Sequence, residues 1–448
     1  MSKKPVRRRR GRHTSRPKAP SLPKEVTEVA VSAVGAKGDG LAKNDAGIDY
    51  FIPYSVAGDV VAVKTVDKRG SAYVGDIQHI ITPGDTRVDA PCPHYTKCGG
   101  CSLQHLSASA YEAWKKERVQ EALSRSDISN PVEDPILIGP GQRRRASFAV
   151  MKKGKKIVFG FNTRSSHRIE EIDHCLLLTP ALDKMIGALR TLMPAIMKQE
   201  GRGDVIINYP DGPCDITFAL PGRLELKAHE ELVRFAETHD VGRLSWQENG
   251  KGEPETILQR AVVTTTFAST SVELPPSPFL QPSKEGEDAL AKFVLGALAG
   301  TEKKILDLYA GCGSFTFVLA EKAIVHAVES NGAALKTLEL SAGRNKMGGR
   351  ITTEVRDLSR QPLMGKELEK YDALLFDPPR AGAKEQAEEI AQSDIPLVIA
   401  ISCNPATFAR DAAALIDGGY SLDKVIPVDQ FTWSAHVEVA AIFTKNKS

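Results

Sequence analysis

KKILDLYAGCGSF, residues 303–315, reads as an apolar strand that passes through a glycine turn into the start of a helix. Gly311 and Gly313 let the backbone approach a ligand closely, and Ser314 can cap the following helix. A nicotinamide cofactor fits this pattern, but Thr316 takes the place of the third glycine of G-x-G-x-x-G and disfavours a tight pyrophosphate turn. The segment predicts a Rossmann-like α/β domain with a mostly parallel sheet.

Two further strands are expected after this turn. Residues 324–328 form an apolar run that ends at Glu329, and residues 351–355 are followed by Asp357. A carboxylate at the end of the second strand can accept both hydroxyls of a ribose, as S-adenosylmethionine and NAD both require. Asp357 can accept a hydrogen bond from an adenine amine.

Two reactive segments follow apolar runs nearer the C-terminus, Asp377-Pro378-Pro379-Arg380 and Ser402-Cys403-Asn404-Pro405. In an open α/β sheet such positions fall at the carboxyl ends of neighbouring strands, where ligands bind. A thiolate suits attack on a soft, conjugated carbon, and an aspartate in a rigid turn can hold an amide-like edge by hydrogen bonds. The pair indicates covalent chemistry on a nucleobase.

With these segments in place, the chain resembles the S-adenosylmethionine-dependent RNA uracil-5-methyltransferases over nearly everything beyond its basic N-terminus. The matching pieces are Phe279-Leu280-Gln281, Asp307-Leu308-Tyr309-Ala310-Gly311-Cys312-Gly313, Asp377-Pro378-Pro379-Arg380-Ala381-Gly382, Ser402-Cys403-Asn404-Pro405 and His436-Val437-Glu438. The resemblance implies that the cofactor site is lined by Gln281, Tyr309, Ser314, Glu329, Asp357 and Asp377. It also implies that Asp377 contacts the target base, Cys403 is the nucleophile and Glu438 removes the C5 proton.

The chemistry of uracil leads to the same roles. C5 is too weak a nucleophile to take a methyl group unaided, so a thiolate must first add to C6 and form an enolate. A helix beginning near Pro405 and the cation of Arg380 are expected to lower the pKa of Cys403. Glu438, on a strand predicted at residues 437–443, is the candidate general base, and His436 is expected to orient the loop. Residues 431–435 depart from the Phe-Pro-x-Thr stretch of the family.

Three cysteines, Cys92, Cys98 and Cys101, form a C-x5-C-x2-C pattern, and Cys175 can supply a fourth thiolate. Four thiolates can hold either a [4Fe-4S] cluster or zinc, and the spacing alone leaves both open. The resemblance implies iron and sulfur, in a structural or RNA-orienting role. Cys214 and Cys312 are expected to be unligated, the latter as a small packing residue.

The chain is expected to contain a tail and three domains. Residues 1–22 read as a basic disordered tail. Residues 23–83 read as a small β-barrel that resembles the RNA-binding TRAM domain, with strand-like runs at 26–34, 50–52, 59–66 and 71–81. Residues 84–274 form a central α/β domain that carries the four cysteines, and residues 275–448 form the methyltransferase domain.

Composition sets further limits. The 448-residue chain is 42% hydrophobic, as globular proteins are, and has neither an apolar run of membrane-spanning length nor a secretory signal, so a cytoplasmic location is expected. The formal net charge is +3, with basic residues concentrated between Arg7 and Arg12, where they can bind phosphate or merely solubilise the chain. Arg143-Arg144-Arg145 is expected to contact RNA phosphates, with an exposed charge run as the alternative.

These features predict methylation of uridine C5 in structured RNA. Ribosomal 23S RNA is preferred over tRNA because the four-cysteine pattern resembles the branch that acts on large-subunit rRNA. No membrane and no protein partner are implied. A noncatalytic RNA-binding protein and a nicotinamide oxidoreductase are the alternatives from other classes; the presence of Cys403, Asp377 and Glu438 opposes the first, and a cofactor titration would test the second.

Overall fold

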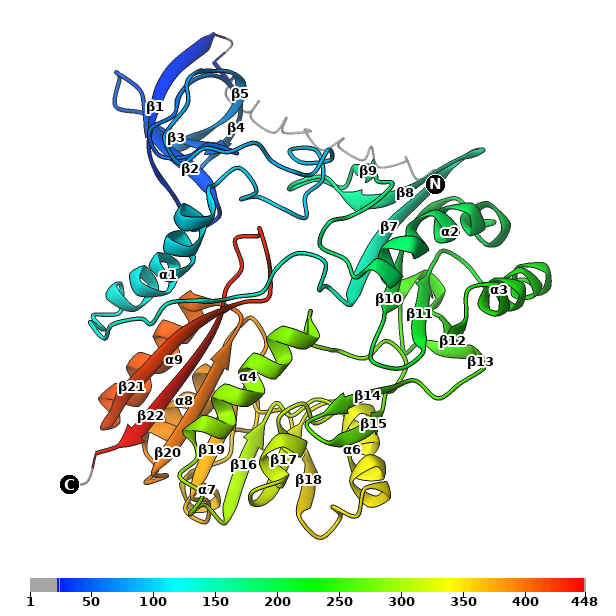
Figure 1. The fold of residues 1–448 in the computed structure, drawn as a ribbon, viewed down its shortest axis with the longest axis vertical. Coiled ribbons are helices and arrows are strands. Elements are labelled where there is room, and N and C mark those ends of the chain that lie inside the picture. The colour runs from blue at the N-terminus through cyan, green and yellow to red at the C-terminus, as the bar shows by residue number, and fades with distance from the viewer. Residues whose placement is uncertain (1–21, 24, 447–448) are drawn as a thin grey trace, which may run out of the picture. The chain divides into compact units, whose positions relative to one another are not determined.

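The computed structural model describes residues 22–23 and 25–446, which divide into two compact units (Figure 1). The first contains the described residues up to Gly35 and continues from Asp39 to Asp85. The second contains Ala36–Gly38 and the described chain from Thr86 onward. The predicted basic tail lies almost wholly outside the described residues. Among the helices in the described ranges, none has the length and apolar character needed to cross a bilayer.

The first unit is a closed five-stranded barrel with strand order β1-β2-β3-β5-β4. Its strands are β1 (Val26–Val34), β2 (Asp39–Lys43), β3 (Asp49–Pro53), β4 (Val60–Arg69) and β5 (Ala72–Thr82). Alternate side chains, among them Val29, Ile52 and Val63, fill its core. The barrel confirms the predicted β-barrel. Sequence reasoning missed β2, because its Asp and Gly read as a turn; Gly40 is required there, since a Cβ would lie 2.0 Å from Ser55 Oγ.

The second unit contains a seven-stranded sheet in its central part, with order β13-β12-β11-β10-β7-β8-β9. The strands are β7 (Arg145–Lys153), β8 (Lys156–Asn162), β9 (Ile169–Glu171), β10 (Gly201–Asn208), β11 (Cys214–Ala219), β12 (Val241–Trp246) and β13 (Glu255–Gln259). Helices α2 (Pro180–Ile196) and α3 (Leu226–Thr238) bury their apolar stripes against this sheet. A 3-10 turn, η1 (Glu248–Gly250), and the hairpin of β14 (Thr264–Phe267) and β15 (Thr270–Glu273) follow.

The same unit contains an eight-stranded sheet with order β18-β17-β16-β19-β20-β22-β21-β6. Its strands are β6 (Ile136–Leu137), β16 (Lys304–Leu308), β17 (Ile324–Glu329), β18 (Ile351–Val355), β19 (Ala373–Phe376), β20 (Leu397–Ser402), β21 (Tyr420–Asp429) and β22 (Glu438–Lys445). The five strands from β18 to β20 run parallel, while β22 is antiparallel to both β20 and β21. This confirms the predicted Rossmann-like fold.

Helices cover both faces of this sheet (Figure 1). They are α1 (Ala108–Ser124), α4 (Lys284–Ala297), α5 (Thr316–Ala320), α6 (Gly332–Arg344), α7 (Gly365–Leu368), α8 (Lys384–Ala391) and α9 (Pro405–Asp417). Ile305 packs on the face of α4, α5 and α6, whereas Leu306 packs on the face of α1, α8 and α9. Although α1 and β6 precede the seven-stranded sheet in sequence, they pack against the eight-stranded sheet.

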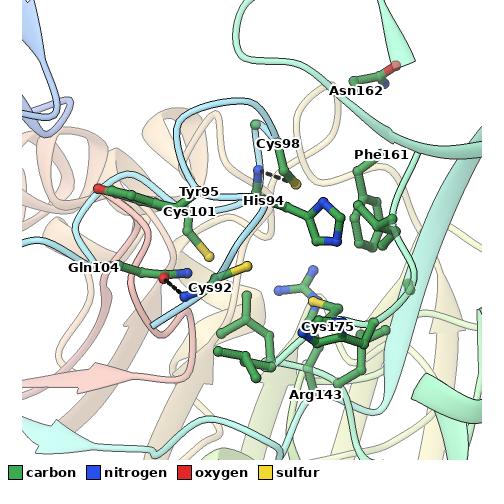
Figure 2. Close-up of a pocket in the computed structure, with 18 of the residues that line it drawn as sticks. Cys92, His94, Tyr95, Cys98, Cys101, Gln104, Arg143, Phe161, Asn162 and Cys175 are labelled. Atoms are coloured by element: carbon green, nitrogen blue, oxygen red, sulfur yellow. Dashed lines mark hydrogen bonds between the residues drawn. The ribbon is translucent and has the colours of Figure 1, made fainter. Parts of the chain in front are cut away.

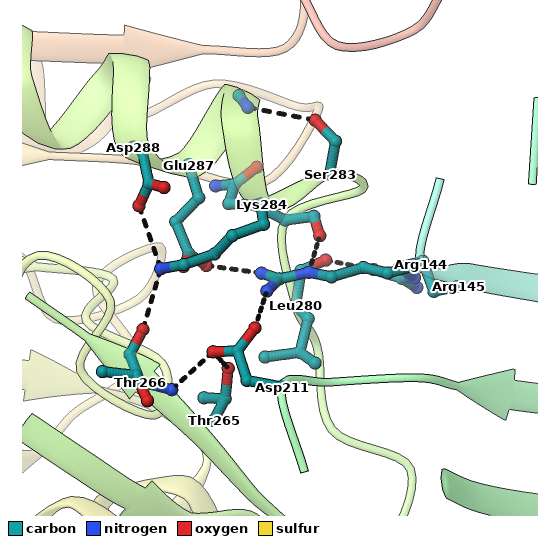
Figure 3. A network of polar contacts seen from close by, with 12 residues as sticks. Arg144, Arg145, Asp211, Thr265, Thr266, Leu280, Ser283, Lys284, Glu287 and Asp288 are labelled. Carbon is teal, nitrogen blue, oxygen red and sulfur yellow. Dashed lines mark hydrogen bonds and ion pairs between the residues drawn. The ribbon is translucent and has the colours of Figure 1, made fainter. Parts of the chain in front are cut away.

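The two sheets of the second unit are joined by a polar network around Arg144 (Figure 3). Its guanidinium donates 2.6 Å to Glu287 Oε2 on α4 and 3.1 Å to the Gln281 carbonyl. Arg145 donates 3.0 Å to the Leu280 carbonyl. Arg144 is only 3% exposed, so the expected phosphate contact is wrong for this residue. The sequence showed three adjacent cations but not the buried glutamate, 143 residues away, that pairs with one of them.

Candidate active site

The candidate site forms where four strands of the eight-stranded sheet end or begin. Tyr309 follows β16, Asp377 follows β19 and Cys403 follows β20. Glu438 begins β22, which is antiparallel to β20, so that Ser402 pairs with Val439. The antiparallel register therefore brings the start of β22 beside the end of β20. Adjacent strand ends thus gather the three predicted catalytic residues, Asp377, Cys403 and Glu438, at the sheet edge where ligands bind in open α/β folds.

Asp377 and Glu438 are joined by two glutamine side chains. Gln281 Nε2 donates to Asp377 Oδ2 at 3.3 Å. Gln430 Nε2 donates to Gln281 Oε1 at 2.8 Å and to Glu438 Oε2 at 3.0 Å. Burial, and then the charge of Asp377, raise the pKa of Glu438 to about 8, against the lowering effect of Gln430. Desolvation also raises the pKa of Asp377 to about 7. Both carboxyl groups therefore change charge near neutral pH.

These two carboxylates also affect the pKa of the Cys403 thiol. Burial raises its pKa to about 11, and the charges of Glu438 and Asp377 add to the rise. Asn404 caps α9, which begins at Pro405, and Arg380 lowers the pKa of the thiol, as expected from the sequence. The expectation of a lowered pKa is nevertheless wrong, because burial and two acidic neighbours outweigh one cation and the helix terminus. In the free protein the thiol is therefore protonated at neutral pH.

The turn after β16 supplies the predicted cofactor residues. Tyr309, Gly311 and Gly313 all have positive φ, of 62°, 56° and 100°. Glu329, at the end of β17, accepts from the Gly311 backbone at 3.0 Å. Its other carboxylate oxygen caps the start of the next loop at Asn331. The glycine turn and the end of the second strand are therefore held together.

The remaining predicted cofactor residues lie around this turn. Ser314 is half-buried in the turn, and Gln281 is buried where it contacts Asp377. Asp357 is exposed beyond β18, where its carboxylate accepts from Ser359. The expected cap by Ser314 is wrong, because Phe315 occupies the N-cap of the helix, which begins at Thr316 and has no side-chain cap. Thr316 donates its hydroxyl to Asp307.

The four predicted ligand cysteines line a second cavity, of about 330 Å³ (Figure 2). Cys92, Cys98 and Cys101 come from the segment before α1, and Cys175 comes from the loop before α2. Figure 2 shows their sulfur atoms around a common space, with the Arg143 side chain beside Cys175. Sequence positions about 75 residues apart, namely 101 and 175, are therefore brought together as predicted.

The four cysteines of this cavity are partly buried. Burial raises the pKa of Cys98, of Cys101 to about 12 and of Cys175 to about 11, and neighbouring thiols add to each rise. Within residues 22–23 and 25–446, no group of three or more His, Cys, Asp or Glu side chains is placed to hold a metal ion. The cysteines thus share a cavity without converging on a single point.

Comparison with known proteins decides the family. A model described as tRNA (Uracil-5-)-methyltransferase matches residues 267–446. An uncharacterized RNA methyltransferase of Mesorhizobium japonicum is 37% identical over 415 residues, covering 93% of this chain and 97% of the relative. A 23S rRNA (uracil(1939)-C(5))-methyltransferase of Halomonas elongata is 31% identical over 432 residues, covering 92% and 88%. The chain belongs to the RNA uracil-5-methyltransferase family.

A solved structure shows the same fold. The tRNA (uracil-54, C5)-methyltransferase of Pyrococcus abyssi, solved with S-adenosyl-L-homocysteine, is 20% identical to this RNA uracil-5-methyltransferase. The two structures align with a TM-score of 0.71, and the alignment covers 93% of this chain and 100% of the Pyrococcus abyssi chain. The predicted family, fold class and enzyme class are confirmed. Membership argues against the nicotinamide oxidoreductase alternative.

Sequence reasoning missed two buried polar residues of this methyltransferase site. Gln430 bridges Gln281 and Glu438, and its only local signal is a polar residue directly after the apolar strand β21. Asp307, inside β16, is 1% exposed, and burial raises its pKa to about 7. A carboxylate in an apolar strand was a visible signal, since such a group is rarely fully buried without a reason.

Proposed function

We propose that this enzyme transfers a methyl group from S-adenosylmethionine to C5 of a uridine in structured RNA through a covalent bond between Cys403 and C6. One observation carries the proposal: Cys403, Asp377 and Glu438 lie at adjacent strand ends and influence one another electrostatically. A nucleophile, a group that can bind the base edge and a proton acceptor are the parts that this reaction needs.

Each residue has one role in the proposed reaction. The thiol of Cys403 releases its proton to water, the resulting thiolate forms a bond to C6, and the electron pair of the C5–C6 double bond moves toward C5 and the O4 carbonyl. Asp377 holds the amide-like edge of the base. After C5 has accepted the methyl group, Glu438 takes the C5 proton, the double bond re-forms and the thiolate leaves. The raised pKa of Glu438, about 8, suits a group that accepts a proton near neutral pH.

S-adenosylmethionine, when bound, supplies the electrophilic methyl group. We assign its site to the residues around the β16 turn and the neighbouring strand ends, which are Gln281, Tyr309, Ser314, Glu329, Asp357 and Asp377. The hydrogen bond from the Gly311 backbone to Glu329 supports this assignment. It fixes the carboxylate and leaves the glycine turn open toward a ligand. A Cβ on Gly311 would meet no atom within 4 Å, so this face of the turn is open.

The proposed substrate is 23S rRNA, with tRNA as the alternative. The Halomonas elongata relative is named for 23S rRNA, whereas the matching family model is named for tRNA. Mapping 5-methyluridine in both RNAs from cells with and without this protein distinguishes the two. Loss of one modified 23S uridine supports the proposal, and loss from tRNA alone overturns the rRNA assignment. A cytoplasmic location is proposed with this substrate, and cell fractionation tests it.

We further propose that Cys92, Cys98, Cys101 and Cys175 hold a [4Fe-4S] cluster. Zinc would draw four sulfurs to about 2.3 Å from one point. The cavity of about 330 Å³ is much larger than a single ion needs, and its thiols do not converge, which favours a multi-atom group. The half-buried Arg143 guanidinium at the cavity wall would balance the negative charge of four thiolates.

The division of the second unit stays a prediction. Residues 84–274 and 275–448 each contain a sheet with its own core, which supports two domains. However, α1 and β6, from the first of these segments, pack against the methyltransferase sheet. Limited proteolysis would show whether the chain is cut near residue 274 into two stable parts.

The covalent step is tested with two variants. Cys403→Ala should bind RNA and S-adenosylmethionine but form no adduct and transfer no methyl group. Glu438→Gln should still allow attack and methylation but leave the C5 proton in place, so a methylated protein–RNA adduct should accumulate on denaturing gels. Turnover by Cys403→Ala would show that the nucleophile is wrong. Normal turnover by Glu438→Gln without a trapped adduct would show that another group removes the proton.

A further inference from the structure

Gln430 occupies an unusual position for a neutral side chain. It lies directly after β21, is 4% exposed, and contacts the carboxylate of the proposed base and the amide of Gln281. Both hydrogen bonds are donated by the same nitrogen, Nε2, while Oε1 has no hydrogen-bond partner among the described residues. The side chain therefore serves as a donor toward the carboxylate network.

The orientation of this amide is fixed by its neighbours. Gln281 donates through Nε2 to Asp377 and so presents its oxygen to Gln430. Rotating the Gln430 amide by 180° would place its oxygen against both that oxygen and the Glu438 carboxylate. Helix α4 closes the remaining space, since a Cβ on Gly286 would lie 2.8 Å from Gln430 Oε1. The two amides thus form a directional chain between the two acids.

We propose that Gln430 is a positioning residue for proton abstraction, which favours the ionised form of Glu438 by donating a hydrogen bond to it and ties its orientation to Gln281 and Asp377. The inference rests on the proposed function, because it assumes that Glu438 accepts the C5 proton. A neutral amide fits this place: a cation would form an ion pair that weakens the base, and a carboxylate would oppose its ionisation.

The groups facing Glu438 come from three neighbouring elements. Asp377, after β19, carries a negative charge that opposes the ionisation of Glu438, whereas the thiol of Cys403, after β20, is neutral over the pH range in which Glu438 titrates. Gln430, after β21, lowers the pKa of Glu438, while burial raises it. Removing the Gln430 donor leaves only influences that raise this pKa. The base would then be protonated over a wider range of pH and unable to accept the proton.

The test is the pH dependence of turnover in Gln430→Met and Gln430→Glu, two side chains of similar size. In both, the acidic limb of the kcat profile should move upward by about one pH unit, which is about a tenfold loss near pH 7. Activity should recover above pH 9 in Gln430→Met. The methylated covalent adduct should accumulate at pH 7, because attack and methyl transfer precede proton removal.

Gln386→Met is the matched control. Gln386 is also a buried glutamine, but its amide pairs with the backbone of Leu363. Its loss should lower the melting temperature without moving the pH profile. An unchanged profile in both folded Gln430 variants, or an equal loss at every pH without adduct, overturns the inference. Failure of the proposed function looks different, since Glu438→Gln would then turn over normally in the presence of Gln430.

Discussion

Cys403 lies beside two acidic side chains whose charge governs its reactivity. At pH 9 Glu438, with a pKa of about 8, is mostly ionised and opposes formation of the thiolate. Glu438→Gln should therefore lower the pKa of Cys403 and speed its alkylation by iodoacetamide at pH 9, by about tenfold for each unit of pKa. Mass spectrometry of the peptide that contains Cys403 gives the rate.

Glu438→Asp retains the charge and is the control, with an alkylation rate close to that of the wild type. At pH 6, where Glu438 is mostly protonated, the difference between wild type and Glu438→Gln should shrink. Equal rates for wild type and Glu438→Gln at pH 9 would mean that the carboxylate does not act on the thiol. The same experiment indicates how substrate binding can activate Cys403, since any group that neutralises the acidic pair lowers the pKa of the nucleophile.

At the scale of elements, β7 and α4 hold the segment that carries Gln281. Arg144, directly before β7, pairs with Glu287 of α4, and both side chains are 4% exposed. Removing Arg144 leaves the buried Glu287 with Lys284 alone, whose partly exposed Nζ lies 2.9 Å from Oε1, so part of the carboxylate charge is uncompensated. We therefore expect Arg144→Met to lower the free energy of unfolding by about 3–5 kcal/mol. Urea denaturation followed by circular dichroism measures it.

In the double variant Arg144→Met/Glu287→Gln, the loss of unfolding free energy should be smaller than the sum of the losses in the two single variants. The reason is that the double variant leaves no unpaired charge from this pair. The comparison is an ion pair on the surface of α3, between Arg234 and Glu231, whose side chains are 60% and 32% exposed. Arg234→Met should change stability by less than about 1 kcal/mol. A loss for Arg144→Met no larger than that for Arg234→Met would refute a joining role for the network.

These elements also show how far sequence reasoning reaches. Local patterns were sufficient for β16 and its glycine turn, for the start of α9 at Pro405, and for the strand that begins near Glu438. Each depends on neighbours within one turn or one strand. Gln430 and Arg144 were missed or misread because their partners, Gln281 and Glu287, lie 149 and 143 residues away. Such pairing depends on packing, which no local pattern records.

The pKa of Cys403 was mispredicted for a related reason. The cation and the helix terminus are visible nearby in the sequence, and the charge of Arg380 does lower the pKa of the thiol. Burial and the approach of Asp377 and Glu438 depend on the order of the strands, in which β19 and β22 flank β20. The net shift of a pKa can thus be opposite to the shift that the charges nearest in the sequence would cause.

For the second unit as a whole, the cysteine cavity should contain iron. Protein purified without oxygen should be brown and hold about four iron atoms per chain. Cys98→Ala should lose iron and lower the melting temperature, because the cavity would lose one of its ligands. Cys214→Ala, which changes a buried cysteine of the central core, should keep its iron. One zinc per chain without iron would refute the cluster.

In the same unit, backbone hydrogen bonds link the cysteine segment of this cavity to the loop before Glu438, the proposed base. The backbone amides of Ser102 and Leu103, directly after Cys101, both donate to the Trp433 carbonyl, at 2.8 and 3.0 Å. Trp433 has a positive φ of 58°, and its loop leads into Glu438. Two fixed donors hold the carbonyl of this residue in a conformation that side chains disfavour. Movement of the cysteine segment would therefore remove one of the contacts that hold this loop, which Lys115 also fixes at the carbonyls of Ser434 and His436.

Loss of iron should consequently slow proton removal more than methyl transfer. In Cys98→Ala that remains folded at low temperature, single-turnover methylation of RNA should stay close to wild type, while the methylated adduct persists longer. The ratio of adduct to released product, measured beside iron content and melting temperature, checks this expectation. An adduct that decays at the wild-type rate in iron-free, folded protein would show that the cavity stabilises the chain without reaching Glu438 through Trp433.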